Sequence, residues 1–252
     1  MDAQPVLNAG IDRLLAGCGP VPSSGSGSGS VPAVRQVLDL GGGTGGQAVR
    51  LALAGHHVTV VDPSPDALAA LSRRADEAGV SQRLQGVQGE AENLSALVPD
   101  ASIDLVLCHG VLEVVDDPDQ ALGALRAALR GTGRLSLVVA QRNAALLARV
   151  ASGHLRAAQH LLHDPHGRWG SGDPLQRRFD HDAVVDLLQR NAFVLQETEG
   201  LRVFADLVPR VALSGEGGVT ALLAELEAHA SNAPAFLDIA AQLHVHAAPA
   251  PG

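Results

Sequence analysis

The sequence contains no lysine and no tyrosine, and aromatic residues make up only 2% of the chain. All 18 basic residues are therefore arginines, which we attribute to genomic base composition rather than to function. Acidic residues outnumber them and give a formal net charge of −9. Broad binding to nucleic-acid phosphates needs clustered cations, so this charge argues against it, although it leaves room for a local arginine patch.

Cysteines and long apolar segments are also scarce. The two cysteines, Cys18 and Cys108, do not form a disulfide framework, which agrees with a reducing compartment. No apolar run reaches the roughly 20 residues that cross a bilayer. Residues 1–19 lack the basic start and apolar stretch of a secretion signal. We therefore expect a cytoplasmic protein with no membrane partner.

The chain does have enough apolar sequence for one core. Its 252 residues are 46% hydrophobic, which suits a single α/β domain. A Gly/Ser-rich stretch within residues 20–32 has the composition of a flexible linker. We therefore expect an N-terminal helix and linker over 1–33, a main domain over 34–247 and a tail over 248–252.

Short strands and helices alternate along the main domain. Apolar, β-branched runs predict strands at 34–40, 57–62, 84–87, 103–108 and, after a Gly-Thr-Gly turn, 135–139. Helical spacing fills the intervals, and one helix begins at Pro65 after the N-cap residue Ser64. This alternation predicts an α/β fold, Rossmann-like and doubly wound, with a mostly parallel seven-stranded sheet.

The alternation breaks after the fifth strand. Residues 143–178 contain one or two helices and a loop rich in Gly, Pro and Arg, and such insertions usually cover the binding crevice. Beyond this lid-like insertion we expect helices at 180–191 and 219–230, strands at 193–200 and 201–207, and an antiparallel edge strand at 241–247.

The loop after the first strand fits two nucleotide-binding patterns. It satisfies G-x-G-x-x-G of dinucleotide sites and also G-x-G-x-G preceded by an acid, Asp39. A carboxylate there repels a pyrophosphate and attracts a sulfonium and an ammonium, so it favours S-adenosylmethionine as the cofactor. Glycines let the backbone pass close to a ligand. We expect cofactor contacts from Asp39, Gly41, Gly42, Gly43 and Gly45.

Two further segments can bind an adenosyl group. Asp62 ends the second strand about 20 residues after the glycines and can accept hydrogen bonds from both ribose hydroxyls, a feature that NAD sites share. After the third strand, residues 89–93 can read the adenine edge, and several of them compete for that role. We assign Glu90 and Ala91 to it.

These residues resemble a known family. Residues 37–45 are similar to motif I of class I S-adenosylmethionine-dependent methyltransferases, and Asp62 matches their acidic second-strand end. A closer resemblance, over residues 34–208, is to the bacterial tRNA 5-carboxymethoxyuridine methyltransferases, carried by residues 103–114 and by Leu201-Arg202-Val203-Phe204-Ala205-Asp206. It implies methyl transfer to the carboxylate of this wobble uridine, with the tRNA anticodon loop as partner.

A carboxylate acceptor sets simple chemical demands. With a pKa of about 4 it is ionised at neutral pH and needs no general base, only a cation that holds it. Arg202 is our first candidate for that cation, and Arg177 and Arg178 are the second. His109, just past the fourth strand, lies where open sheets place ligand contacts, so it can touch the cofactor or act as a base.

Histidines gather in two places. His160, His163 and His166 offer only a partial helix face, because Pro165 ends their helix. For these and for the pair at 244 and 246 we identify no cysteine or convergent acid, so we expect no metal site.

Three alternatives to a tRNA methyltransferase stay open. A small-molecule O- or N-methyltransferase fits the acidic net charge and the scarcity of aromatics. A non-catalytic protein that binds the donor would retain the same fold. A nicotinamide-dependent reductase is disfavoured because Asp39 would lie against its pyrophosphate.

Overall fold

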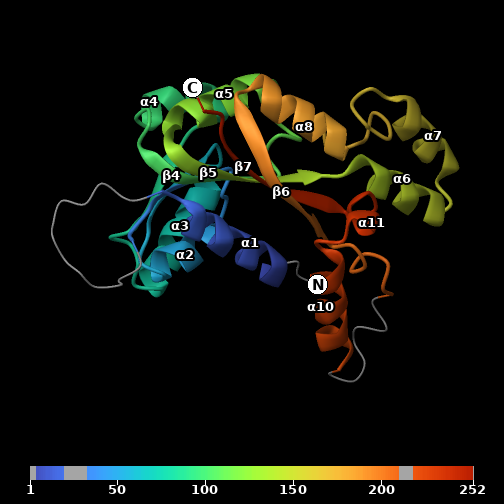
Figure 1. Cartoon of the computed structure of the whole chain (residues 1–252), viewed down its shortest axis with the longest axis horizontal. Helices are drawn as coiled ribbons and strands as arrows, with labels where there is room; N and C mark the ends of the chain where they lie inside the picture. The colour runs from blue at the N-terminus through green and yellow to red at the C-terminus, as the bar shows by residue number, and fades with distance from the viewer. Residues whose placement is uncertain (1–3, 20–32, 210–217, 252) are drawn as a thin grey trace.

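A seven-stranded sheet runs through the molecule in the order β3-β2-β1-β4-β5-β7-β6 (Figure 1). The computed structural model describes residues 4–19, 33–209 and 218–251, so the expected Gly/Ser linker lies outside the described residues. The strands are β1 (Gln36–Leu40), β2 (His57–Asp62), β3 (Leu84–Gln88), β4 (Ile103–His109), β5 (Leu129–Ala140), β6 (Phe193–Leu201) and β7 (Gln242–Pro249).

The strands from β3 to β5 pair in parallel, whereas β7 is antiparallel to both of its neighbours. The expected mostly parallel, seven-stranded α/β fold is thus confirmed, with the antiparallel strand at one end, next to the outermost β6. The central strands are continuous apolar runs because helices cover both faces; in β4 every residue but His109 is buried.

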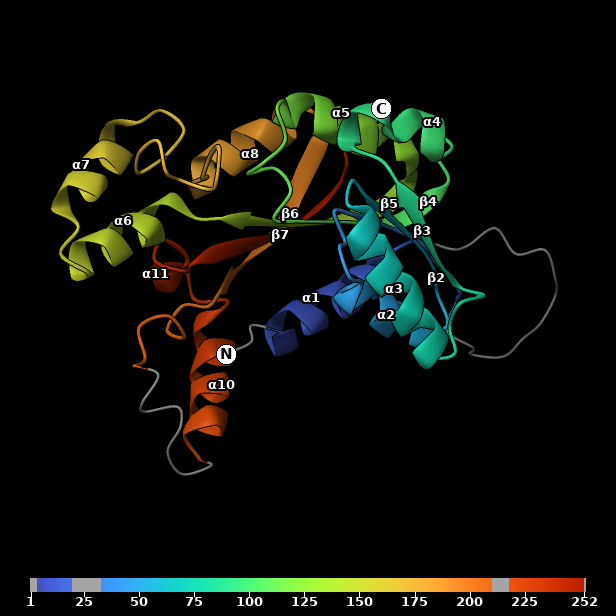
Figure 2. The same ribbon diagram turned by 180° about the vertical axis from the view of Figure 1, so that it is seen from behind.

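Helices α1 (Gln4–Gly17), α2 (Gly46–Leu53) and α3 (Pro65–Glu77) cover one face of the sheet (Figures 1 and 2). The other face carries α4 (Leu94–Leu97) after the short turn η1 (Ala91–Asn93), then α5 (Pro118–Ala128) and α8 (His181–Arg190). Ile11 and Leu14 of α1 share a buried cluster with Leu105 and Leu107 of β4. The N-terminal helix is therefore part of the main core.

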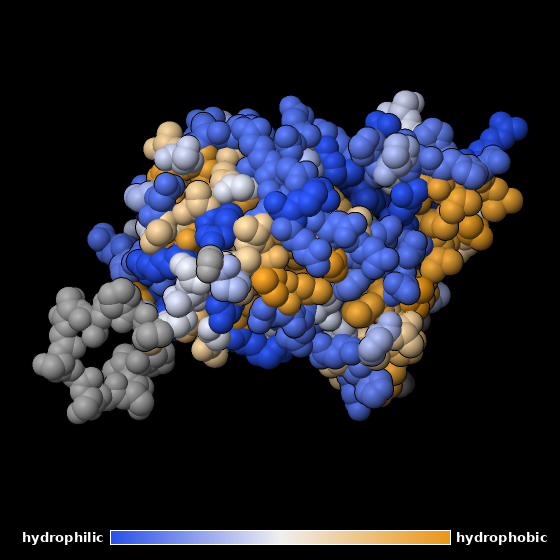
Figure 3. Space-filling view, turned by 45° about the horizontal axis from the view of Figure 1, so that its top comes forward, coloured by the Kyte–Doolittle hydropathy of each residue, from blue (hydrophilic) through white to orange (hydrophobic). Residues whose placement is uncertain are grey.

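The insertion after β5 contains α6 (Arg142–Ala151) and α7 (Leu155–His163), followed by a long loop, as the sequence indicates. Figure 3 shows a hydrophobic surface at the end of the molecule where these two helices lie. Their exposed large apolar side chains are Leu147, Val150, Leu155 and Leu162. Helices α10 (Val219–Ala230) and α11 (Pro234–Leu237) connect β6 to β7. No helix in the described part of the chain has the length and hydrophobicity of a membrane span.

Three local expectations are wrong. Of the segment 201–207 only Leu201 is in a strand, because the chain leaves β6 at Arg202 in a left-handed conformation (φ 56°) and turns. Residues 131–133 form no separate turn, because β5 begins at Leu129, with a register shift against β4. Strand β7 continues to Pro249, into the segment expected to be a tail, and pairs there with Phe193.

Candidate active site

A cavity of about 430 Å³ opens at the carboxyl ends of β1, β2, β3 and β4. Of the residues expected to contact a cofactor, five line it: Gly41, Asp62, Glu90, Ala91 and His109. Half of its other ten lining residues lie within 110–116, which follow β4. The ionisable lining side chains are acids and one histidine, and no arginine lines it. This wall suits a cationic adenosyl ligand and opposes a pyrophosphate.

Asp39 lies beneath the glycine loop rather than in the cavity wall. It is only 4% exposed, and a Cβ at position 42 would lie 2.5 Å from its Oδ2. Any side chain at position 42 would therefore clash with this carboxylate, and only glycine lets the backbone pass over it. Burial, and to a smaller extent the nearby Asp62, raise the pKa of Asp39 to about 7. A cation bound above the loop would favour the ionised form.

Asp62 holds the loop and lines the cavity at the same time. Its Oδ2 accepts a 2.9 Å hydrogen bond from the backbone N–H of Gly43, and its Oδ1 accepts one of 2.9 Å from that of Ser64. Ser64 in turn caps α3 by accepting from the Ala67 N–H, as the sequence predicts. A carboxylate has further lone pairs, so these bonds leave Asp62 able to accept from a ribose.

Two other glycines of the loop have different structural roles. Gly41 lies in the cavity wall with φ +68°, and a Cβ there would come within 2.5 Å of Cγ2 of its neighbour Val111, which also lines the cavity. Gly45 is the N-cap of α2. A residue with a side chain at position 41 would both strain the backbone and narrow the cavity. The bare backbone at Gly41 thus fits a ligand that lies directly on the loop.

The segment after β3 is shaped by a reciprocal cap. The Glu90 N–H donates to Asn93 Oδ1 at 2.9 Å, while the Glu90 side chain accepts from the Asn93 backbone. Glu90 and Glu92 are exposed at the rim, whereas Ala91 is buried. The side chain and the backbone N–H of Glu90 therefore both serve the turn.

His109 ends β4 in the cavity wall, where the sequence places it. Its Nε2 lies 2.9 Å from Ser136 Oγ on β5, so that nitrogen already has a partner. Burial, with a contribution from nearby His244, lowers the pKa of His109 to about 3. The ring is neutral at physiological pH and too weakly basic for efficient proton abstraction.

The arginine candidates lie outside this cavity wall. Arg177 donates to the carbonyls of Leu112, Val115 and Asp116 and so fixes the loop that lines the cavity. Arg178 makes a two-point ion pair with the buried side chain of Asp173. Both guanidinium groups therefore hold the protein's own loops.

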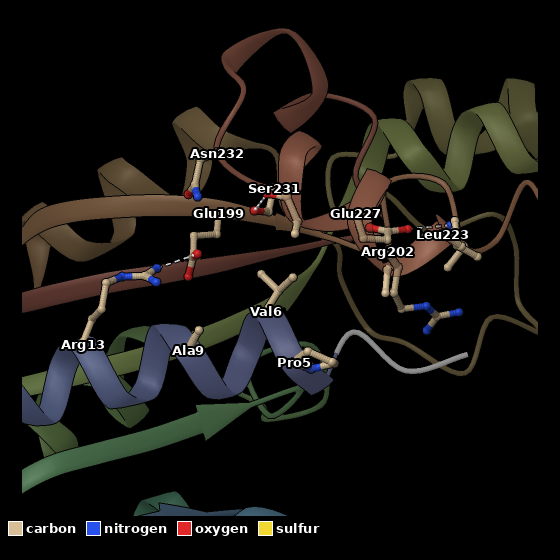
Figure 4. Close-up of a pocket in the computed structure, with 13 residues that line it drawn as sticks. Pro5, Val6, Ala9, Arg13, Glu199, Arg202, Leu223, Glu227, Ser231 and Asn232 are labelled. Atoms are coloured by element: carbon tan, nitrogen blue, oxygen red, sulfur yellow. Dashed lines mark hydrogen bonds and ion pairs between the residues drawn. The ribbon is translucent and has the colours of Figure 1, made fainter. Parts of the chain in front are cut away.

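Arg202 lies at the same carboxyl edge of the sheet, but in a different cavity. It lines a hollow of about 270 Å³ between α1, β6 and α10 (Figure 4), which Asp206 does not line. Its guanidinium pairs with Asp206. The structure therefore does not bring Arg202 and His109 into one cavity. The sequence did not predict this second cavity, because α1 and α10 come from opposite ends of the chain.

Two further features escape sequence reasoning. Glu113, inside the segment 110–116, is 2% exposed, and its Oε1 accepts a 2.5 Å hydrogen bond from the Ala140 N–H. Burial raises its pKa. In addition, Glu199 of β6 lies against His244 and His246, so the expectation that no acid converges on these histidines is wrong. Among the described residues, no other group of this kind occurs.

The fold and the acid-lined cavity define a protein suited to a cationic adenosyl cofactor, and comparison with known proteins shows its family. Residues 38–137 match the methyltransferase domain model. The tRNA 5-carboxymethoxyuridine methyltransferase of Escherichia coli K12 is 30% identical over 203 residues, covering 81% of this chain and 72% of that protein. The chain belongs to the S-adenosylmethionine-dependent methyltransferases, and its cofactor is S-adenosylmethionine.

Other similar proteins either match a smaller part of the chain or are less identical to it. The ubiquinone biosynthesis O-methyltransferase of Aeromonas salmonicida is 35% identical over 109 residues, covering 43% of this chain and 44% of that one. A solved S-adenosylmethionine-dependent methyltransferase from Methanosarcina mazei has a TM-score of 0.59 at 18% identity, over 87% of this chain and 94% of that one. The geranyl diphosphate C-methyltransferase of Streptomyces coelicolor has a TM-score of 0.57 at 14% identity, over 97% and 78%. These structural likenesses support the fold alone.

Proposed function

We propose that this methyltransferase transfers the methyl group to the carboxylate of 5-carboxymethoxyuridine in tRNA. The similarity to the Escherichia coli enzyme spans 81% of the chain and so extends well beyond the cofactor half. In the cofactor cavity, the proposal assigns the contacts to Gly41 and Asp62, to the backbone around Ala91 and to His109, above the buried Asp39.

The observation that carries the acceptor class is the state of His109. A hydroxyl acceptor must give its proton to a base, and the one histidine in the cavity, whose pKa is about 3 and whose Nε2 is bonded to Ser136, is a poor base. A carboxylate acceptor is already ionised. Its oxygen forms the new bond to the methyl carbon while the carbon–sulfur bond breaks and the sulfur keeps the electron pair, so no proton moves.

Within this proposal the protein contributes mainly alignment and exclusion of water. His109, tied to Ser136, is a fixed contact at the cavity wall, and Arg177 holds the adjoining loop through three carbonyl groups. We assign Arg202 to the acceptor carboxylate; because Arg202 lines the second cavity and not the cofactor cavity, this assignment requires an acceptor that reaches from one cavity to the other. To bind that carboxylate, Arg202 must exchange its half-exposed ion pair with Asp206 for the substrate. An exposed pair of this kind contributes little stability, so breaking it costs little free energy.

The insertion carries a positive formal charge, which fits an RNA acceptor better than the negative charge of the whole chain does. Residues 142–178 contain six arginines and two aspartates, a formal charge of +4, whereas the whole chain carries −9. Arg149 also lies over the ring of the partly exposed Trp169, 4.4 Å from its centroid. A local basic surface with an aromatic ring can contact phosphates and an unstacked base. A tRNA substrate would also place the enzyme in the cytoplasm.

The test uses purified protein, S-adenosylmethionine and tRNA that carries 5-carboxymethoxyuridine, with nucleoside mass spectrometry as the readout. We expect the methyl ester of that nucleoside, and none with tRNA that lacks the carboxymethoxy group. tRNA from a deletion strain should lack the same ester. Calorimetry with S-adenosylhomocysteine is the control, because cofactor binding without ester formation would overturn the tRNA proposal alone.

A small-molecule carboxylate or hydroxyl compound is the second candidate acceptor. The overall charge of −9 and the 35% identity to the ubiquinone biosynthesis O-methyltransferase over 109 residues favour it. The same protein preparation, offered a panel of small acids and phenols in place of tRNA, distinguishes the two. Turnover of a small acid with no turnover of tRNA would assign the second function, and cofactor binding with no turnover would assign a donor-binding role.

A further inference from the structure

Two adjacent strands bring a glutamate and two histidines together on the face of the sheet that α1 covers. Glu199 of β6 stands directly opposite His244 of β7, and His246 lies two residues further along β7. Because side chains alternate along a strand, all three project from the same face. Their exposures are 1%, 0% and 3%, so the cluster is closed to bulk solvent.

The donor atoms of this cluster form a nearly equilateral triangle. Glu199 Oε2 lies 3.1 Å from His244 Nδ1 and 3.2 Å from His246 Nε2, and the two nitrogens lie 3.3 Å apart. In a tetrahedral zinc site with bonds of about 2.0 to 2.1 Å, neighbouring ligand atoms are about 3.3 to 3.4 Å apart. Two N–H groups converging this closely on one oxygen would instead repel each other.

The second ring nitrogen of each histidine and the other carboxylate oxygen of Glu199 all have partners, as the outer atoms of metal ligands commonly do. The second nitrogen of His244 lies 2.8 Å from Ser136 Oγ, and that of His246 lies 3.2 Å from Glu197 Oε2. Arg13 of α1 donates to the other carboxylate oxygen of Glu199 at 2.6 Å. Metal-binding histidines commonly use their second nitrogen on a carboxylate or another acceptor, which fixes the ring and frees the first nitrogen for the ion.

Helix α1 passes directly over the cluster at one residue. A Cβ at Gly10 would lie 2.5 Å from Glu199 Oε2 and 2.9 Å from His244 Nδ1. A glycine at this position therefore lets the helix pack against the cluster without displacing these two donor atoms. Glu199 and Arg13 also line the second cavity, between α1 and α10, which Figure 4 shows.

We propose that Glu199, His244 and His246 bind one Zn²⁺ ion, with a solvent molecule as the fourth ligand. The ion would join β6 to β7, and through Arg13 it would join both strands to α1. None of its three ligands lines the cofactor cavity, so the proposal does not rest on the methyl acceptor. Two histidines and one glutamate are an established zinc ligand set in proteins.

The first test measures the metal content of the full chain, purified without chelator, by inductively coupled plasma mass spectrometry. We expect one zinc ion per chain, and after removal of zinc we expect Co²⁺ to give the absorption spectrum of four-coordinate cobalt. The thermal midpoint should rise on zinc addition, because an ion that binds only the folded state stabilises it. Wild-type protein that takes up neither ion would overturn the proposal and leave a hydrogen-bonded cluster.

Variants distinguish zinc bound at this site from zinc bound to surface histidines. Glu199→Gln and His246→Ala should lose stoichiometric zinc, and Ser136→Ala, which keeps all three ligands, should weaken binding about 10- to 100-fold. The matched control is the double variant His160→Ala/His163→Ala, which removes the exposed pair on α7 and should keep one ion per chain. Loss of zinc in this control, with retention in His246→Ala, would contradict the proposal even if Glu199→Gln failed to fold.

Discussion

The backbone N–H of Gly43 donates a 2.9 Å hydrogen bond to Oδ2 of Asp62, so the end of β2 fixes the middle of the glycine loop. The same carboxylate lines the cofactor cavity. One side chain therefore shapes the loop and faces the ligand, and its removal should affect cofactor binding more than a simple contact would.

We predict that Asp62→Ala weakens the binding of S-adenosylhomocysteine by about ten- to a hundredfold. The reason is the loss of the charge-assisted hydrogen bonding to the ribose, which contributes about 1.5 to 3 kcal/mol to the binding free energy. Isothermal titration calorimetry is the measurement. Glu77→Ala, an exposed acid at the end of α3, is the matched control and should bind normally. Equal affinity in Asp62→Ala would remove this residue from the site.

Cofactor binding should depend on pH through Asp39. Its pKa is raised to about 7 in the free protein, and a bound cation lowers it again, so binding releases a proton below that pH. Affinity should be full above about pH 8 and fall by up to about tenfold per pH unit below pH 7. Asp39→Asn should bind weakly with a flat profile between pH 5.5 and about 8. A flat profile in the wild type would mean that Asp39 does not sense the cofactor.

Gly41→Ala should abolish cofactor binding and lower stability modestly. The left-handed backbone at this position costs alanine roughly 1 to 2 kcal/mol, and the new methyl group would clash with the neighbouring Val111 in the cavity wall. Gly46→Ala is the control in the same loop, because a Cβ there has no neighbour within 4 Å. Thermal melts with and without S-adenosylhomocysteine compare the two. The prediction fails if the Gly41 variant is still stabilised by the ligand.

His109→Gln should lower the turnover number on 5-carboxymethoxyuridine tRNA by less than about tenfold. Glutamine can still reach Ser136, and a histidine with a pKa of about 3 does not serve as the base. Removal of a true general base would cost about 10² to 10⁴ in rate. Single-turnover kinetics at saturating cofactor make this measurement, and a loss in that larger range would favour an acceptor that must be deprotonated.

Arg202→Ala should raise the KM for the tRNA substrate by about ten- to a hundredfold while leaving S-adenosylhomocysteine binding unchanged, because it removes a charge-assisted contact to the acceptor carboxylate. Arg190→Ala is the comparison, since Arg190 also forms a surface ion pair, with Asp119. An unchanged KM in Arg202→Ala would reduce Arg202 to a structural side chain of the second cavity and would leave the acceptor carboxylate to another cation.

The local sequence determined the elements and the cofactor loop, because those depend on neighbours in the chain. The strand at 57–62, the cap at Ser64 and the helix at 219–230 lie where the sequence predicts them, since alternation and capping are local signals. Asp62 and Gly41 meet in one cavity because parallel strands end at a common edge, which the βαβ order already implies.

Only the tertiary structure decided what residues far apart in sequence do together. Asp39 is buried under Gly42, and Arg177 is bound to the loop after β4, so neither the pKa of the first nor the occupation of the second can be read from spacing. Glu199 reaches His244 and His246 because β7 inserts antiparallel between β5 and β6. Sequence periodicity fixes which face a side chain takes, whereas strand order and register, set by packing of the whole core, fix which side chains share that face.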